Sequence, residues 1–149
     1  MLFDGKVCRA AAEDIEAVAE TEALCFSDAW SASSLLSHTE GAGGLLLVAK
    51  RGNDLVGYLT ARVLPPECEL YRIAVLPISR HMGAASALMD ALFALLKEEG
   101  CSSLFLEVRE SNSPAIALYK KFGMQEVGRR KKYYRDPTED AILFAKDGI

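Results

Sequence analysis

The chain has 149 residues, of which 50% are hydrophobic and 26% are charged, as expected for a soluble globular protein with one hydrophobic core. Its formal net charge of −4 does not favour binding to nucleic acid. No apolar run reaches the roughly 18 residues that a membrane-spanning helix needs, and the first residues lack the features of a signal peptide, so we expect a cytoplasmic protein with one domain over residues 1–149.

The apolar periodicity predicts helices inserted into a mostly antiparallel sheet. In chain order, the predicted elements are a strand over 7–10, helices over 12–25 and 31–37, strands over 45–50, 55–64 and 69–75, a long helix over 83–99, a strand over 104–108, a helix over 113–122, and a last strand pair over 124–134 and 141–146. Ser31 is a favourable helix cap, and Gly100 and Gly123 are placed to end the two later helices. Only the two strands joined by the long helix are expected to run parallel, because a crossover connection links them.

The segment over residues 72–85 is the most informative part of the sequence. It reads R-I-A-V-L-P-I-S-R-H-M-G-A-A, an apolar strand that runs into a short loop and then into the long helix. Gly83 and the small residues after it let the backbone approach a ligand closely. The first N–H groups of a helix have no internal partners, and the helix dipole adds partial positive charge there. The sequence therefore predicts a phosphate or pyrophosphate site at the start of this helix.

A second segment, over residues 106–123, reads L-E-V-R-E-S-N-S-P-A-I-A-L-Y-K-K-F-G and carries a carboxylate on a strand, then an asparagine, then a phenol on a helix. Glu107 lies between two apolar residues of the strand. A carboxylate in such a place is either paired or functional, because burying an unpaired charge is costly. The sequence is compatible with two roles for Glu107: an ion pair with Arg109 or Arg72, and a general base.

Two further residues are candidates for proton transfer. Glu69 competes with Glu107 for the role of base from the neighbouring strand, where Tyr71 and Ile73 are expected on the same face. Tyr119 is either a general acid, since a phenol with a pKa of about 10 can protonate a leaving group, or a core tyrosine whose hydroxyl bonds to the backbone.

No metal site is predicted. His38 and His81 are isolated in the sequence, and the basic run over 129–132 is either a solvated face or a patch that meets phosphate or an acidic partner. The four cysteines are widely separated and lack metal-ligand spacing: Cys8, Cys25, Cys68 and Cys101.

These motifs resemble those of the GNAT acetyltransferases. The R-x-x-G-x-A pattern over 80–85, after R-I-A-V-x-P, is similar to the acyl-CoA signature of that superfamily, and the 106–123 segment looks like its next block. Three more segments resemble the ribosomal-protein-alanine N-acetyltransferases, the RimI branch: R-R-K-K-Y-Y, the later P-T-E-D-A-I-L-F and the early C-F-S-D-A-W-S. The resemblance implies the GNAT fold, an α/β (α+β) architecture with a mixed, mostly antiparallel sheet of six to seven strands and about four helices on both faces, splayed to admit acetyl-CoA.

The function that this resemblance implies is transfer of acetyl from acetyl-CoA to the α-amino group of a protein N-terminus. The RimI branch points to the N-terminal alanine of a small-subunit ribosomal protein, whose amine attacks the thioester directly, without a metal. Two alternatives stay open, a GNAT enzyme that acetylates a small amine (a polyamine, an amino acid or an aminoglycoside) and a CoA-binding sensor without catalysis. The implied partners include neither nucleic acid nor membrane, and the expected state is a monomer or weak dimer.

The resemblance also implies residue roles. Glu107 is the expected base, Glu69 is an alternative base or substrate-positioning group, and Tyr119 is the acid that protonates the CoA thiolate. Tyr133 and Tyr134 are expected to bind substrate, in a wall that includes Glu139 and Asp140. The residues implied in cofactor binding are Ile73, Ala74, Val75, Arg80, His81, Met82, Gly83, Ala84, Ala85, Ser86, Asn112 and Tyr119. One departure is Ala85 in place of a second glycine, which costs little if its backbone φ is negative.

Overall fold

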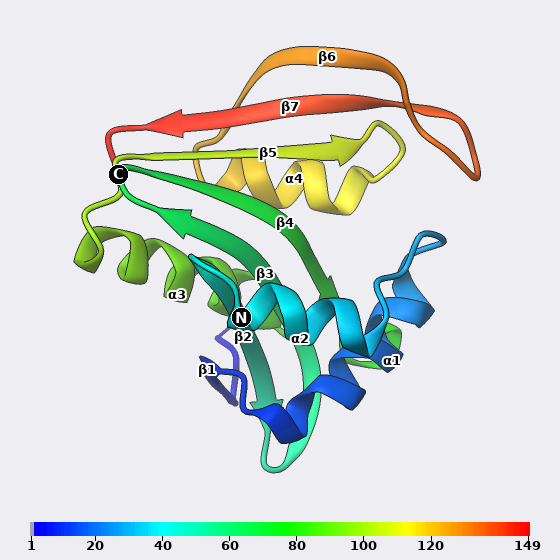
Figure 1. Cartoon of the computed structure of the whole chain (residues 1–149), viewed down its shortest axis with the longest axis vertical. Helices are drawn as coiled ribbons and strands as arrows, with labels where there is room; N and C mark the ends of the chain where they lie inside the picture. Colours follow the sequence, from blue (N-terminus) through cyan, green and yellow to red (C-terminus); the bar gives the residue numbers. More distant parts are fainter. Residues whose placement is uncertain (1) are drawn as a thin grey trace.

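The computed structural model describes residues 2–149, which form a seven-stranded sheet with helices on both faces (Figure 1). The elements in chain order are β1 (Lys6–Arg9), η1 (Ala12–Asp14), α1 (Ile15–Cys25), α2 (Ala32–Glu40), β2 (Gly44–Arg51), β3 (Asp54–Leu64), β4 (Glu67–Val75), η2 (Pro77–Ser79), α3 (Ala84–Glu98), β5 (Ser103–Arg109), α4 (Ser113–Lys121), β6 (Gln125–Tyr134) and β7 (Glu139–Asp147), where η1 and η2 are short 3₁₀ helices. Every predicted strand and helix is present, with ends that differ by a few residues.

The strands lie in the order β1-β2-β3-β4-β5-β7-β6. All neighbouring pairs are antiparallel except β4 and β5, which run parallel because α3 carries the chain from one to the other. Helices α3 and α4 pack on one face of the sheet, and α1 and α2 cover the other. This arrangement confirms the predicted mixed, mostly antiparallel sheet with helices on both faces.

Strands β4 and β5 separate along their length. Their pairing covers only Glu67–Leu70 of β4 against residues 103–106 of β5, whereas β4 stays paired with β3 as far as Val75. On its other side β5 stays paired with β7 as far as Arg109. Figure 1 shows the two strands spreading apart towards their carboxyl ends. The second half of β4 therefore has one edge without a neighbouring strand.

A register shift in the β3–β4 pair changes the face of the sheet to which the later side chains of β4 point. Thr60 of β3 pairs with Arg72, but the next residue, Ala61, pairs with Leu70, so Tyr71 is an extra residue at this point. As a result Tyr71 packs against Trp30 on the α1–α2 side, while Ile73 packs into the core on the α3 side. The expectation that Ile73 shares a face with Tyr71 is wrong, because simple alternation does not hold across a β-bulge.

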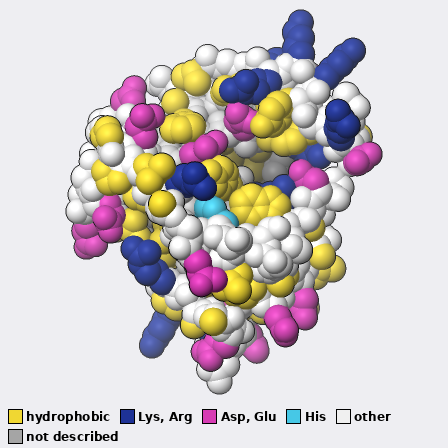
Figure 2. Space-filling view, in the orientation of Figure 1, with side chains coloured by type: hydrophobic (Ala, Val, Ile, Leu, Met, Phe, Trp, Pro, Cys, Tyr) yellow, Lys and Arg dark blue, Asp and Glu magenta, His cyan; other side chains and the backbone are white. Residues whose placement is uncertain are grey.

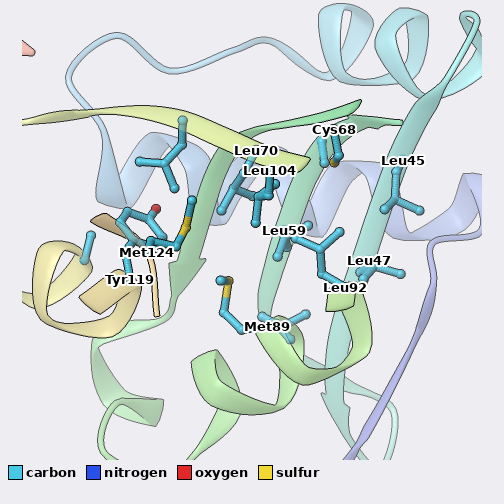
Figure 3. Close-up of a cluster of buried hydrophobic side chains, with 14 of the residues drawn as sticks. Leu45, Leu47, Leu59, Cys68, Leu70, Met89, Leu92, Leu104, Tyr119 and Met124 are labelled. Carbon is cyan, nitrogen blue, oxygen red and sulfur yellow. The ribbon is translucent and has the colours of Figure 1, made fainter. Parts of the chain in front are cut away.

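The larger hydrophobic core lies between the sheet and α3. Leu88, Met89, Leu92 and Leu96 of α3 are fully buried against the strands, and burial of each such side chain contributes roughly 1.5–3 kcal/mol. Figure 3 shows Met89 and Leu92 directed at the sheet and Tyr119 of α4 beside Met124 in the same cluster. This packing holds the first turn of α3 and the inner face of α4 next to the gap between β4 and β5.

None of the helices within residues 2–149 is both long and apolar enough to cross a membrane. The same residues contain no group of three or more His, Cys, Asp or Glu side chains arranged to hold a metal ion. All four cysteines are free thiols, and Cys68 and Cys101 lie buried in the core.

Candidate active site

A cavity of about 890 Å³ lies where β4 and β5 separate, and Figure 2 shows the molecule hollowed on this side. Three of the predicted site residues do not line it: Glu69, Met82 and Tyr133. The predicted site residues that do line it are Ile73, Ala74, Val75, Arg80, His81, Gly83, Ala84, Ala85, Ser86, Glu107, Asn112, Tyr119 and Tyr134. One continuous space therefore joins the start of α3 to the residues predicted to transfer protons.

The start of α3 presents free backbone donors to the cavity. The first hydrogen bond of the helix runs from Ala87 N to Gly83 O, and within residues 2–149 the N–H groups of residues 84–86 have no backbone acceptor. Gly83 caps the helix with a φ of 85°, and His81 before it also has a positive φ, of 65°. We call Gly83 and the three N–H groups the α3 cradle; free donors of this kind at a helix start suit an anion. Ala85 lies within the helix, where alanine is favourable.

The exposed edge of β4 forms the floor between the cradle and the rest of the cavity. Leu76 N donates to Val56 O of β3. Because backbone groups alternate in direction along a strand, the N–H and C=O groups of Ile73 and Val75 point away from β3, into the gap. Val75 O accepts a hydrogen bond from Arg80 Nε at 3.2 Å, which ties the loop before α3 to this edge. The remaining groups of the edge can pair with an extended ligand.

Lys121 is a residue of this site that the sequence did not single out. Its Nζ donates to Ser86 Oγ at 2.9 Å, which places an ammonium group from the end of α4 beside the α3 cradle. Lys120 precedes it in the sequence and does not line the cavity. The two lysines look alike in the sequence, and only the packing of α4 against the start of α3 distinguishes them.

Replacing Lys121 with methionine is expected to raise the dissociation constant for acetyl-CoA by up to roughly five-fold, because one exposed cation beside the phosphates is removed. The effect is expected to be larger at low salt, where screening is weaker. Lys120→Met is the matched control and is expected to bind like wild type. Calorimetric titration at two salt concentrations measures both; equal affinities for the two variants would contradict this assignment.

A substitution of Gly83 by valine is expected to weaken acetyl-CoA binding by about 10-fold or more, because a β-branched residue is strained at positive φ and its side chain would enter the cradle. Gly100, at the opposite end of α3, has a φ of 80° and open space where a Cβ would lie. Gly100→Val therefore carries the same backbone strain away from the cavity. Loss of thermal stability in both variants, with loss of affinity only in Gly83→Val, is the expected pattern.

Tyr119 lies at the inner end of the cavity. Tyr119 is only 4% exposed, and α4, which carries it, is capped by Asn112, whose side-chain oxygen accepts a hydrogen bond from Ala115 N at 3.3 Å. Burial, with a smaller contribution from Tyr134, raises the pKa of the Tyr119 phenol above its ordinary value, so the group stays protonated at neutral pH. Tyr119 lines the cavity, so its hydroxyl is placed to donate to a bound ligand.

Glu107 is paired with a different arginine from those expected. Its Oε1 lies 3.0 Å from Arg130 Nε, on β6, while Arg109 pairs with Glu139 and Arg72 pairs with Glu22. The expected partners, Arg109 and Arg72, are therefore wrong, because β6 folds back over β7 and brings Arg130 to this point. The Glu107 side chain remains 22% exposed and lines the cavity, so it can still reach a substrate.

Glu69 lies near Glu107 but outside the cavity lining. Its pKa is raised, mainly by burial and then by the negative charge of Glu107, while Arg62 and a hydrogen bond with Tyr71 oppose the rise. The two carboxylates therefore form an interacting pair, of which only Glu107 faces the cavity.

The turn between β6 and β7 forms the wall of the cavity opposite α1. Arg109 holds this turn: its guanidinium donates to Pro137 O at 2.9 Å and Arg135 O at 2.7 Å, and it stacks 4.6 Å from the centre of the Tyr134 ring. Glu139 pairs with Arg109 at 3.1 Å. Hydrogen bonds from Ser111 and Arg109 lower the pKa of Glu139.

The predicted acidic and aromatic wall is thus only partly present. Glu139 and Asp140 are both engaged by arginines, with Asp140 Oδ2 lying 3.0 Å from Arg129 Nη1. Tyr134 lines the cavity, whereas Tyr133 is 52% exposed and lies close enough to Glu107 for a hydrogen bond that raises the pKa of the Tyr133 phenol. This wall therefore presents Tyr134 and the arginine-paired carboxylate of Glu139 to the cavity.

Comparison with known proteins gives a consistent result. The model of the "Acetyltransferase (GNAT) family" matches residues 15–124. The chain is 36% identical over 135 residues to the [ribosomal protein bS18]-alanine N-acetyltransferase of Haemophilus influenzae, which covers 89% of this chain and 91% of that protein. Two solved structures are similar: the ribosomal-protein-S18-alanine N-acetyltransferase of Escherichia coli (TM-score 0.88, 30% identity, 96% of this chain and 93% of that one) and Ard1 of Thermoplasma volcanium (TM-score 0.89, 26% identity, 97% and 98%).

Proposed function

The chain belongs to the GNAT family of acetyltransferases, and we propose that it transfers acetyl from acetyl-CoA to the N-terminal α-amino group of a protein. The proposed acceptor is the N-terminal alanine of a small-subunit ribosomal protein in the cytoplasm, as the names of its relatives from Haemophilus influenzae and Escherichia coli suggest. The observation that carries the proposal is the single cavity that joins the α3 cradle, the exposed β4 edge, Glu107 and Tyr119.

Acetyl-CoA fits the first part of this cavity by its chemistry. The free N–H groups of the α3 cradle suit the pyrophosphate, and Lys121 beside them supplies positive charge. The exposed backbone groups of Ile73 and Val75 can pair with the amides of the pantetheine arm as a neighbouring strand would. In this position the thioester would lie between the separated strands, within reach of Tyr119.

The acceptor amine must be neutral to attack the thioester carbonyl. An α-amino group has a pKa of about 8, so roughly a tenth is neutral at pH 7, whereas a lysine with a pKa of about 10.4 is under a thousandth neutral. Glu107 takes the proton of the attacking amine, directly or through water, and Tyr119 gives a proton to the leaving thiolate. A backbone N–H of the exposed β4 edge stabilises the negative charge on the carbonyl oxygen.

A panel of acceptors tests this proposal by thiol release from acetyl-CoA. The panel contains peptides that begin with Ala, Ser and Met, one N-blocked peptide with an internal lysine, and spermidine. Strong preference for the free Ala terminus is the expected result. Turnover only on spermidine or lysine would show an acetyltransferase for other amines, and binding of acetyl-CoA without turnover on any acceptor would favour a CoA sensor.

A further inference from the structure

A fully buried carboxylate lies behind the cavity and takes no part in the chemistry proposed above. Glu22 of α1 has no exposed surface, yet it accepts hydrogen bonds from the Tyr58 hydroxyl, from Trp30 N at 2.7 Å and from Arg72 Nη1 at 3.1 Å. These partners come from β3, the α1–α2 connection and β4. A buried charge is costly unless it is paired in this way, and the arrangement joins three segments that are distant in the sequence.

Arg72 extends this network to the surface of the cavity. While Nη1 bonds to Glu22, Nη2 lies 3.0 Å from Asp28 Oδ2 and donates to Asp28 O at 3.3 Å. The guanidinium also stacks over the Phe26 ring, 4.3 Å from its centre, and lies 5.9 Å from the Trp30 ring. One side chain thus contacts three of the five residues in the connection over 26–30. The planar fork of arginine can make these contacts together, which the single ammonium of lysine cannot.

The connection over residues 26–30 forms a wall of the cavity. Phe26, Ser27 and Asp28 line it, and so do Tyr134 and Pro137 of the β6–β7 turn. Figure 1 shows the α1–α2 connection and the β6–β7 turn on the same side of the molecule, beyond the carboxyl end of β5. Since the α3 cradle occupies another part of the cavity lining, these two segments are placed to contact the acceptor.

We propose that Arg72 is a positioning residue for acetyl transfer: held by buried Glu22, it fixes the 26–30 connection as the wall against which the acceptor N-terminus binds. The inference rests on the proposed function for the identity of the acceptor. Arg72 does not act on the reacting atoms. Its effect is on how tightly the acceptor binds, because a loosened wall gives up contacts that the ground state and the transition state share.

Arg72→Lys tests the proposal while keeping a positive charge beside Glu22. The expected result is a rise of about 10-fold in the KM for the preferred peptide acceptor, with kcat changed much less and the dissociation constant for acetyl-CoA unchanged. Arg9→Lys is the matched control, because Arg9 is an exposed arginine of β1 whose nearest acidic partner, Glu99, is 4.0 Å away. A KM like that of wild type in Arg72→Lys, or a parallel loss of acetyl-CoA affinity, would overturn the proposal.

A second variant and a second measurement keep the test independent of folding and of the acceptor. Asp28→Asn weakens only the outer contact and leaves the buried Glu22–Arg72 pair intact, so the same split between KM and kcat is expected. Hydrogen exchange needs no acceptor: faster exchange at residues 26–30 in Arg72→Lys, with unchanged exchange in α3, is expected. Unchanged exchange at 26–30 would refute the positioning role, whereas inactivity of the wild-type protein on every peptide would refute only the proposed function.

Discussion

Replacing Tyr119 with phenylalanine is expected to lower kcat by 10-fold or more, towards the range of about 10²–10⁴ that general acid–base groups contribute. The phenol is buried and lines the cavity. Its removal therefore leaves the departing CoA thiolate without a proton donor. Turnover is measured by thiol release at saturating acetyl-CoA and peptide.

Phenylalanine at this position keeps the packing of the ring. Tyr119 packs against Phe144, with ring centres 6.3 Å apart, and both belong to the main core. Thermal stability and affinity for acetyl-CoA are therefore expected to stay close to wild type. A variant that turns over at the wild-type rate would remove Tyr119 from the mechanism, and one that unfolds would show a structural role instead.

The pH dependence of the wild-type enzyme follows from the same burial. A phenol whose pKa is raised above about 10 stays protonated until the pH exceeds that value. The acid form is thus fully present at neutral pH and is lost only in strongly alkaline solution. Between about pH 8 and 9.5 we therefore expect no fall in kcat that is due to Tyr119. A fall in that range that is present in the wild type and absent from Tyr119→Phe would contradict this.

Local sequence signals were enough to predict most elements and the α3 cradle. Ser31 caps α2 as expected and Asn112 caps α4, because a cap depends only on the residues beside it. The cradle was predicted from a strand, a glycine and a helix in succession, all within residues 72–85. The roles of Glu107 and Tyr119 came from resemblance to a family, and the structure adds that both line one cavity.

Features that depend on distant segments were not predictable in this way. The β-bulge at Tyr71, which moves Ile73 to the opposite face, arises from pairing with β3. The partner of Glu107 is Arg130, because β6 lies beyond β7 in the sheet. Glu22 is one of several acidic residues in its segment of the sequence, and only the fold places it at the centre of a buried network. A single sequence contains no signal for such contacts.

Replacing Glu107 with glutamine is expected to lower kcat/KM for the peptide by about 10²-fold or more at neutral pH while acetyl-CoA still binds. Glutamine keeps the size of the side chain and can still accept a hydrogen bond from Arg130, but it cannot take a proton from the amine. Glu69→Gln is the matched variant, since Glu69 lies on the adjacent strand and does not line the cavity. A loss of only a few-fold is expected there.

The pH profiles of these two variants decide which carboxylate is the base, because the carboxylates interact. The negative charge of Glu107 contributes to the raised pKa of Glu69, so Glu107→Gln is expected to lower the pKa of Glu69 towards its ordinary value. If Glu69 were the base, Glu107→Gln would stay active and its acid limb would move to lower pH. If Glu107 is the base, the rate falls at every pH and no shift of the limb restores it. Because Glu107 alone of the pair faces the cavity, we expect the second profile.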